Sequence, residues 1–424
     1  MPRVPAPNPS FIQPTLGCTN EWRFPHYDSA LRQKLSVDGA QPIPLIAERA
    51  WQRTFTPLLG ATYIEWRYYS IISASFHGIL GVAFVNPYNR VPFIAEEGML
   101  VILAGMVDAP RDGTGLGATI QANQHAELCY MHLFPTAACT FEGHTFHGEY
   151  QGVTLHMEQP TTQQAEINLT NPDGLDVALT LNGLPGFEIP PHYADDLRRV
   201  PGAHWTVYCP APVATTSGRI QASSHFLRGL RHKPDPNRAN RISDTLYHSG
   251  DLDITWQDAS GYYEHSFGLN PLPLHGWDFL FVTDAAHKRG IVMQTYPRSE
   301  SLRYIETCWW SDEGPQYVRF TADQMDMHWV ENYTDPEVGV PLPTHRRIQA
   351  RGQGLRLEVD NFVTHQIAFL RAHKLAVRHF FISEQIGFCD WRLTTEGGEV
   401  LAEVVGQPCG GEVAHFRARA PRLR

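Results

Sequence analysis

The chain contains little charge and no clustered cysteines. Asp, Glu, Lys and Arg make up 18% of its 424 residues, below the quarter that is usual in soluble domains. Its seven cysteines are scattered, their number is odd, and none forms a Cys-x-x-Cys pair. This distribution argues against a disulfide framework and favours a reducing compartment, so we expect a cytoplasmic protein.

Long basic or apolar runs are also missing. A formal net charge of −10 disfavours nucleic acid and anionic lipid as partners. No stretch approaches the roughly 20 apolar residues of a membrane-spanning helix, and the residues from Met1 to Pro7 lack the apolar core of a signal peptide. We expect no nucleic-acid partner and no membrane span. The sequence leaves the oligomeric state open.

Helical periodicity is scarce, and only short helices are expected, over Ser29–Leu35, Tyr193–Arg199 and Thr321–Val330. A doubly wound α/β fold needs long amphipathic helices between its strands, so it is excluded. Expected strands recur about every 10 residues, as in sandwiches and barrels. In the first half they cover Tyr63–Ile72, Gly78–Val85, Met99–Val107, Gly115–Ala122, Thr145–Met157, Gln164–Thr170 and Val177–Asn182. With 34 Gly and 32 Pro to form corners, the sequence predicts an all-β protein.

The length of 424 residues exceeds what one hydrophobic core usually supports. A boundary is predicted after Ile189-Pro190-Pro191 and through the short helix that follows, to about Gly202, because a new series of strands starts after it. We expect an N-terminal extension over residues 1–45, one β domain over residues 46–202 and a second over residues 203–424.

One segment, Gly261–Gly268, is the most informative in the chain. It is predicted to be a strand with Tyr263, His265 and Phe267 on one face and Tyr262, Glu264 and Ser266 on the other. A histidine between two aromatic rings on one strand face indicates proton chemistry inside an apolar pocket.

Several segments in order resemble the lipocalin-like carotenoid 1,2-hydratase superfamily, which includes fungal Diels-Alderases. The segments are Tyr63–Tyr69, Pro210–Pro212, Gly218, Gly261–Gly268, Trp277, Phe380–Ile382 and Gly410–Glu412. This resemblance implies two lipocalin-like antiparallel β-barrel domains packed side by side, a substrate cavity near their junction, and chemistry that needs neither a metal nor an organic cofactor. The chain departs from the hydratase pattern at Phe267, where the family has Trp, and beside Tyr296, where a partner Asp is missing.

The resemblance and the strand pattern together nominate site residues. The predicted catalytic residues are His265, assisted by Glu65 or Glu264. The predicted substrate-binding residues are Trp66, Arg67, Tyr68, Tyr263, Phe267, Trp277, Asp278, Phe279 and Tyr296. Two alternatives stay open: the aromatic residues can be ordinary core, and Glu65 with Arg67 can be a structural salt bridge at one barrel end.

No metal site is predicted. His144, His147, Glu149 and His156 lie close in sequence, but alternation sends His144 to the opposite strand face from His147 and Glu149. The Gly-rich run Gly113–Gly117 is followed by neither Lys-Ser nor Lys-Thr, so a hairpin loop is expected there rather than a phosphate site.

The predicted function is that of a cofactor-independent cyclase, either pericyclic or proton-initiated. Its substrate is expected to be a long hydrophobic polyene or an isoprenoid-derived chain in natural-product biosynthesis. A cyclase needs a shaped cavity and one or two hydrogen bonds that polarise the substrate. One alternative is hydration of an isoprenoid double bond, and another is a non-catalytic carrier of hydrophobic ligands.

Overall fold

The computed structural model describes residues 63–85, 98–107, 126–142, 144–187, 189–193, 205–232, 241–242, 250–269, 276–296, 299–334, 341–372 and 378–418. Their strands form two antiparallel sheets. The first sheet contains β1 (Tyr63–Ile72), β2 (Phe76–Val85), β3 (Gly98–Val107), β4 (Ala126–Pro135), β5 (Cys139–Glu142), β6 (Thr145–Tyr150), β7 (Val153–Thr161), β8 (Gln164–Asn171), β9 (Leu175–Gly183), β10 (Ile189–Tyr193), β11 (Trp205–Ala222), β12 (Arg241–Ile242) and β13 (Leu252–Leu269). The second contains β14 (Trp277–Asp284), β15 (Arg289–Tyr296), β16 (Ser299–Ser311), β17 (Gly314–Thr321), β18 (Met325–Thr334), β19 (Pro341–Gly352), β20 (Leu355–Ala372), β21 (Arg378–Thr395) and β22 (Val400–Ala418).

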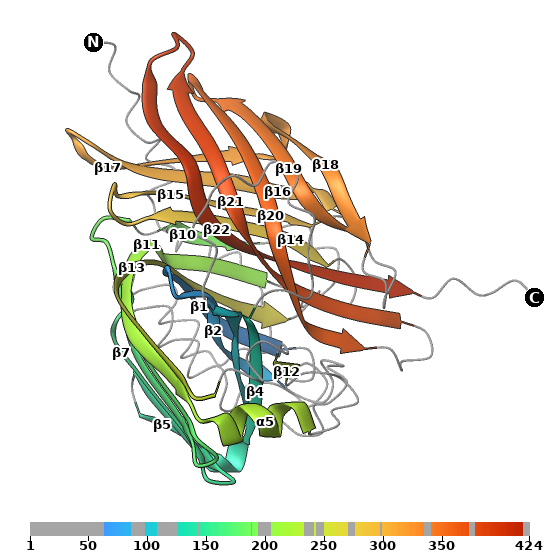
Figure 1. Cartoon of the computed structure of the whole chain (residues 1–424). Coiled ribbons are helices and arrows are strands. Elements are labelled where there is room, and N and C mark those ends of the chain that lie inside the picture. The colour runs from blue at the N-terminus through green and yellow to red at the C-terminus, as the bar shows by residue number, and fades with distance from the viewer. Residues whose placement is uncertain are drawn as a thin grey trace, which may run out of the picture.

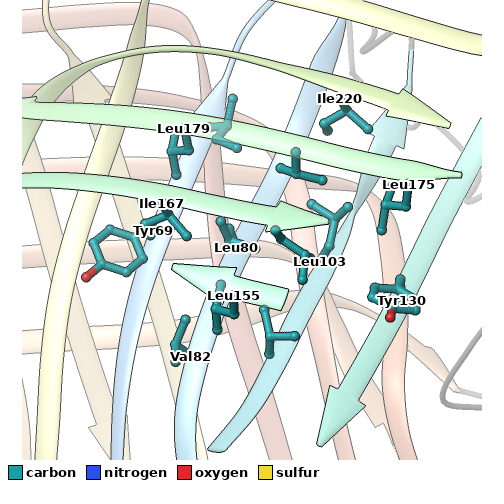
Figure 2. Packing of buried hydrophobic residues seen from close by; sticks show 14 of the residues in the cluster. Tyr69, Leu80, Val82, Leu103, Tyr130, Leu155, Ile167, Leu175, Leu179 and Ile220 are labelled. Carbon is teal, nitrogen blue, oxygen red and sulfur yellow. The ribbon is translucent and has the colours of Figure 1, made fainter. Parts of the chain in front are cut away.

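The first sheet curls around its own core. Its strand order is β12-β4-β3-β2-β1-β13-β11-β9-β8-β7-β6-β5, so the hairpins β1–β4 and β5–β9 lie on opposite sides of the central pair β11 and β13. Leu80 and Leu103 from one arm pack in the same cluster as Leu155 and Ile167 from the other (Figure 2). The sheet is therefore a nearly closed barrel, and helix α5 (Ser224–His232) adds Phe226 to its core.

The second sheet runs in the order β17-β16-β15-β14-β22-β21-β20-β19-β18 and forms a half-barrel. Its concave core contains Leu280, Ile348 and Leu357. An ion pair lies in the same interior, because Arg346 donates to Asp278 through Nε at 3.1 Å and through Nη2 at 2.6 Å.

A third core fills the space between the two sheets, which lie against each other in Figure 1. It combines Tyr68 and Tyr262 of the first sheet with Phe279, Phe281 and Ile386 of the second. We call this region the inter-sheet layer. Each strand that borders it has two buried faces, since its alternate side chains enter either the layer or the core of its own sheet.

The prediction of an all-β protein with two antiparallel β-barrel domains packed side by side is confirmed, with one sheet a nearly closed barrel and the other a half-barrel. The expected strand Tyr63–Ile72 is β1, and Gly261–Gly268 lies within β13. The expected strand over Thr145–Met157 is a hairpin of β6 and β7, which turns at Gln151 and Gly152, both with positive φ. No helix among the described residues is long and apolar enough to cross a membrane.

The helix predicted over Thr321–Val330 is wrong. A capping box at Thr321 starts only a single 3-10 turn over Ala322–Gln324, and β18 follows directly. The burial of side chains along β18 has a period of two. Met325 and Met327 face the core of the second sheet, whereas Asp326 is exposed. Pairing with β19 therefore overrides the weak helical signal. Tyr193 ends β10, and the rest of the helix expected over Tyr193–Arg199 lies outside the described residues, as do the expected helix Ser29–Leu35, the expected strand Gly115–Ala122 and the loop Gly113–Gly117.

The chain passes from the first sheet to the second between Leu269 and Trp277. The predicted boundary at residue 202 precedes β11, which pairs with β9 and β13 inside the first sheet. These pairings join distant parts of the chain, so composition and local pattern do not reveal them. The extension expected over residues 1–45 lies outside the described residues.

Candidate functional site

Strands β1 and β13 hold most of the residues that the sequence nominated. They pair antiparallel, with Arg67 opposite His265 and Tyr68 opposite Glu264. Alternation sends Tyr69 and Tyr263 into the first core, where their rings stack at 4.6 Å, whereas Tyr68 and Tyr262 enter the inter-sheet layer. The predicted division of Gly261–Gly268 into two faces is thus borne out where its side chains are described. It follows that the nominated residues of these two strands form two separate clusters rather than one.

The first cluster lies on the barrel-core face of β1 and β13. His265 and Glu65 are completely buried, with Nε2 and Oε1 2.5 Å apart, and Arg67 is 1% exposed beside them. Burial, with a further contribution from the Arg67 charge, lowers the pKa of His265 well below its usual range. The ring is therefore neutral, and its Nε2 shares a buried hydrogen bond with Glu65 Oε1. A fully buried contact of this kind suits a structural role, the alternative that the sequence left open for Glu65 and Arg67.

The second cluster lies in the inter-sheet layer and begins with Glu264. Its Oε1 accepts hydrogen bonds from Ser266 Oγ at 2.6 Å and from Trp66 Nε1 at 3.3 Å. Its Oε2 accepts one from the Tyr262 hydroxyl at 2.8 Å. The two carboxyl groups predicted to assist His265 therefore lie apart. Glu65 contacts the His265 ring, whereas Glu264 lies on the opposite face of β13.

Two more glutamates, which belong to the second sheet, face the inter-sheet layer that contains Glu264. Glu384 of β21 and Glu412 of β22 are directly opposite each other in the strand register. Tyr68, from the first sheet, donates its hydroxyl to Glu384 at 2.5 Å, and Trp277 Nε1 donates to Glu412 at 2.6 Å. Cross-strand neighbours have Cβ atoms about 5 Å apart, so two negative charges at these positions repel strongly.

These three carboxyl groups have raised pKa values. Burial is the largest cause for each of them. It raises the pKa of Glu412 to about 8, with a contribution from the Glu264 charge, and that of Glu384 well above its ordinary range, with a contribution from Glu412. Among the described residues, no Lys, Arg or His forms an ion pair with any of the three. Glu412 therefore holds its proton at neutral pH, and burial shifts the pKa of Glu384 in the same direction.

Aromatic rings surround this group. Tyr262 and Phe281 stack with centroids 4.7 Å apart, and the Tyr68 ring meets both Phe279 and Phe281 edge-on at about 6 Å. One carboxyl oxygen, Oε2 of Glu384, is buried and forms no hydrogen bond among the described residues. A buried carboxylic acid with an uncommitted oxygen among aromatic rings can give a proton or a hydrogen bond to an apolar guest.

The remaining nominated residues divide between the two sides of β14. Trp277 and Phe279 face the inter-sheet layer. Asp278 faces the second core instead, where Arg346 and Trp329 Nε1 donate to it. Strand β13 contains Phe267 and strand β15 contains Tyr296, but their side chains lie outside the described residues.

Sequence reasoning missed Glu384 and Glu412 as functional residues. Glu384 alternates with Ile382 and Ile386 on one strand face, and an acid between two apolar residues on that face was a usable signal. Glu412 was considered only as part of the family-like Gly410–Glu412 segment. For metals, no group of three or more His, Cys, Asp or Glu is arranged to hold an ion within the described ranges.

Replacing His265 by alanine tests the role that the sequence assigned to it. A proton-transfer role requires at least a tenfold loss of turnover with the fold intact. From the barrel-core location we expect instead a loss of about 3 kcal/mol in the free energy of unfolding, because Glu65 loses a buried hydrogen-bond partner, and a change in turnover of less than tenfold. Urea unfolding and turnover of the same preparation measure both quantities. Unchanged stability with a tenfold slower enzyme would restore His265 to the mechanism.

No protein-family model and no curated protein sequence matches this chain. Solved structures do resemble it. A protein assigned as AttH from Nitrosomonas europaea has a TM-score of 0.47 at 11% identity, over 85% of this chain and 97% of that one. CghA with Sch210972 has a TM-score of 0.47 at 12% identity, over 83% and 88%. Kievitone hydratase from Nectria haematococca has a TM-score of 0.44 at 9% identity, over 83% and 88%. Likeness at this level assigns no activity to the chain, whose all-β architecture is established by its own strand pairing.

Proposed function

We propose that this protein is an enzyme that cyclises a long apolar substrate by means of a buried carboxylic acid. The observation that carries the proposal is the group of buried Glu264 and Glu384 with partly buried Glu412, gathered among aromatic rings between the two sheets. A purely structural layer gains nothing from acids placed there, since each costs free energy to desolvate. Perturbed ionisable groups of this kind are typical of functional sites.

Glu384 is the proposed acid. Its Oε2 gives a proton to a carbon–carbon double bond of the substrate, which leaves a glutamate anion and a carbocation. The π electrons of a second double bond then attack the cation and form the ring bond, and loss of a proton from the adjacent carbon returns that proton to Glu384. The hydroxyl of Tyr68 stabilises the anion at Oε1, and the faces of Phe279 and Phe281 stabilise the cation. For a substrate with a conjugated carbonyl, the same acid would donate a hydrogen bond to its oxygen and promote a pericyclic closure.

Isotope labelling tests this proposal. The protein is incubated with a panel of linear polyenes and terpenoid alkenes in D2O and, separately, in oxygen-18 water. We expect a product of the substrate's constitution that carries deuterium from the solvent at carbon and no oxygen-18. Incorporation of oxygen-18 would support the hydratase alternative. Recovery of every bound compound unchanged would support a carrier and contradict the enzyme.

A further inference from the structure

Gly81 occupies an unusual place in the inter-sheet layer. It lies on β2, directly beside Tyr68 of β1 and Ile102 of β3, both of which face the layer. Its φ lies outside the left-handed region, so the backbone does not require glycine there. Glycine within a strand weakens the strand and often marks the close approach of another group.

No described side chain explains this glycine by filling its place. A Cβ built on Gly81 has as its nearest neighbours Ile102 Cβ at 3.8 Å and two backbone oxygens at 4.0 Å, all from adjacent strands of the same sheet. Gly410, on the opposite wall of the layer, differs because a Cβ there would meet Phe281 at 2.3 Å. Gly410 makes room for a ring of the protein, whereas a Cβ at Gly81 would make only ordinary van der Waals contacts, all within its own sheet among the described residues.

The side chains around Gly81 have larger exposed fractions than Leu80 and Leu103, which lie on the opposite face of the same strands. Around Gly81, Tyr68 and Ala83 are each 8% exposed and Ile102 is 9% exposed, although all lie between two sheets. On the other face of the same strands, Leu80 and Leu103 are 0% exposed. Leu80 and Leu103 are thus fully enclosed in the barrel core, whereas Tyr68, Ala83 and Ile102 keep a small accessible surface beside the Tyr68–Glu384 hydrogen bond.

The width of this space limits what can enter it. Tyr68 and Ile102 flank Gly81 from strands that are two sheet spacings apart, about 9.6 Å between backbones. Once both side chains are placed, one flat chain fits between them. We propose that Gly81 is a specificity-determining residue that admits an unbranched, planar apolar segment of the substrate beside Glu384. This inference rests on the proposed function and favours a linear polyene over a methyl-branched isoprenoid.

Binding of a named probe tests the inference without any turnover. The methyl ester of cis-parinaric acid is an uncharged linear tetraene that quenches tryptophan emission by energy transfer, and Trp66 and Trp277 lie together at this site, 5.7 Å between centroids. We expect the wild type to bind it more tightly than retinyl acetate, a methyl-branched polyene. Gly81→Ala should weaken binding of the linear ester about threefold and Gly81→Leu at least tenfold, because the added atoms fill the space.

Gly229→Leu is the matched control, because nothing lies within 4 Å of a Cβ at that helical position. It should bind as the wild type does. Thermal unfolding verifies that each variant is folded. If Gly81→Leu does not fold, Gly81→Ala alone provides the test. Wild-type affinity in a folded Gly81 variant, no binding of the linear ester to the wild type, or tighter binding of retinyl acetate would each overturn the inference. Glu384→Gln should still bind the ester, so a failure at Gly81 is distinguishable from a failure of the proposed acid catalysis.

Discussion

Glu384→Gln is expected to lower turnover at least 100-fold while the protein stays folded. The glutamine amide keeps the size of the side chain and can still accept the hydrogen bond from Tyr68. It cannot release a proton, and general acids typically contribute a factor of about 100 to 10,000 to the rate. The measurement is the initial rate with a substrate identified by isotope labelling, at a pH near 7 and at saturating concentration.

Glu403→Gln is the matched control for this prediction. Glu403 lies on β22, the strand that holds Glu412, but its side chain is 49% exposed and its partner is Arg392 at 3.5 Å. Loss of an exposed pair of this kind changes stability very little, so turnover should be unaffected. Retention of more than a tenth of wild-type turnover in Glu384→Gln would remove Glu384 from the mechanism. The role would then pass to another acid of the layer.

Glu412→Gln is expected to change how stability depends on pH. The pKa of Glu412 is raised from 4.5 to about 8 on folding, chiefly by burial. Between these values the folded protein binds a proton that the unfolded chain has lost, so the contribution of this group is fully present below pH 4.5 and is lost as the pH rises to about 8. One pKa unit corresponds to about 1.4 kcal/mol. From pH 5 to pH 8, the wild type should therefore lose on the order of 4 kcal/mol that the glutamine variant keeps.

Urea unfolding of both proteins at pH 5 and pH 8 provides the comparison. Other groups titrate in this range, and His77 acts in the opposite direction because burial lowers its pKa to about 4. The quantity of interest is therefore the difference between wild type and variant at each pH, in which those groups cancel. If the free energy of unfolding changes equally with pH in the two proteins, Glu412 is ionised at neutral pH. Glu412 would then not be one of the carboxyl groups that hold a proton.

Some features of the site followed from local pattern. The alternation of apolar and polar residues predicted β1 over its full length and separated Tyr262 and Glu264 from Tyr263 and His265 on β13. The pairing of Glu384 with Glu412 could not be predicted in the same way. Their strands form a long hairpin with register shifts near Cys389 and Leu393. Since a shift of one residue moves a side chain to the other face, the turn alone does not decide which residues stand opposite each other.

By itself, the sequence determined the strands, the scarcity of helices and the division of each strand into two faces, because these depend on backbone preferences and on the two-residue repeat of a strand. Tertiary structure alone decided which face meets which core. It placed His265 against Glu65 inside the barrel, and it brought Tyr68 to Glu384 across 316 residues of chain. The raised pKa values of the inter-sheet glutamates arise at that same step, because only the packing of one sheet on the other removes these carboxyl groups from water.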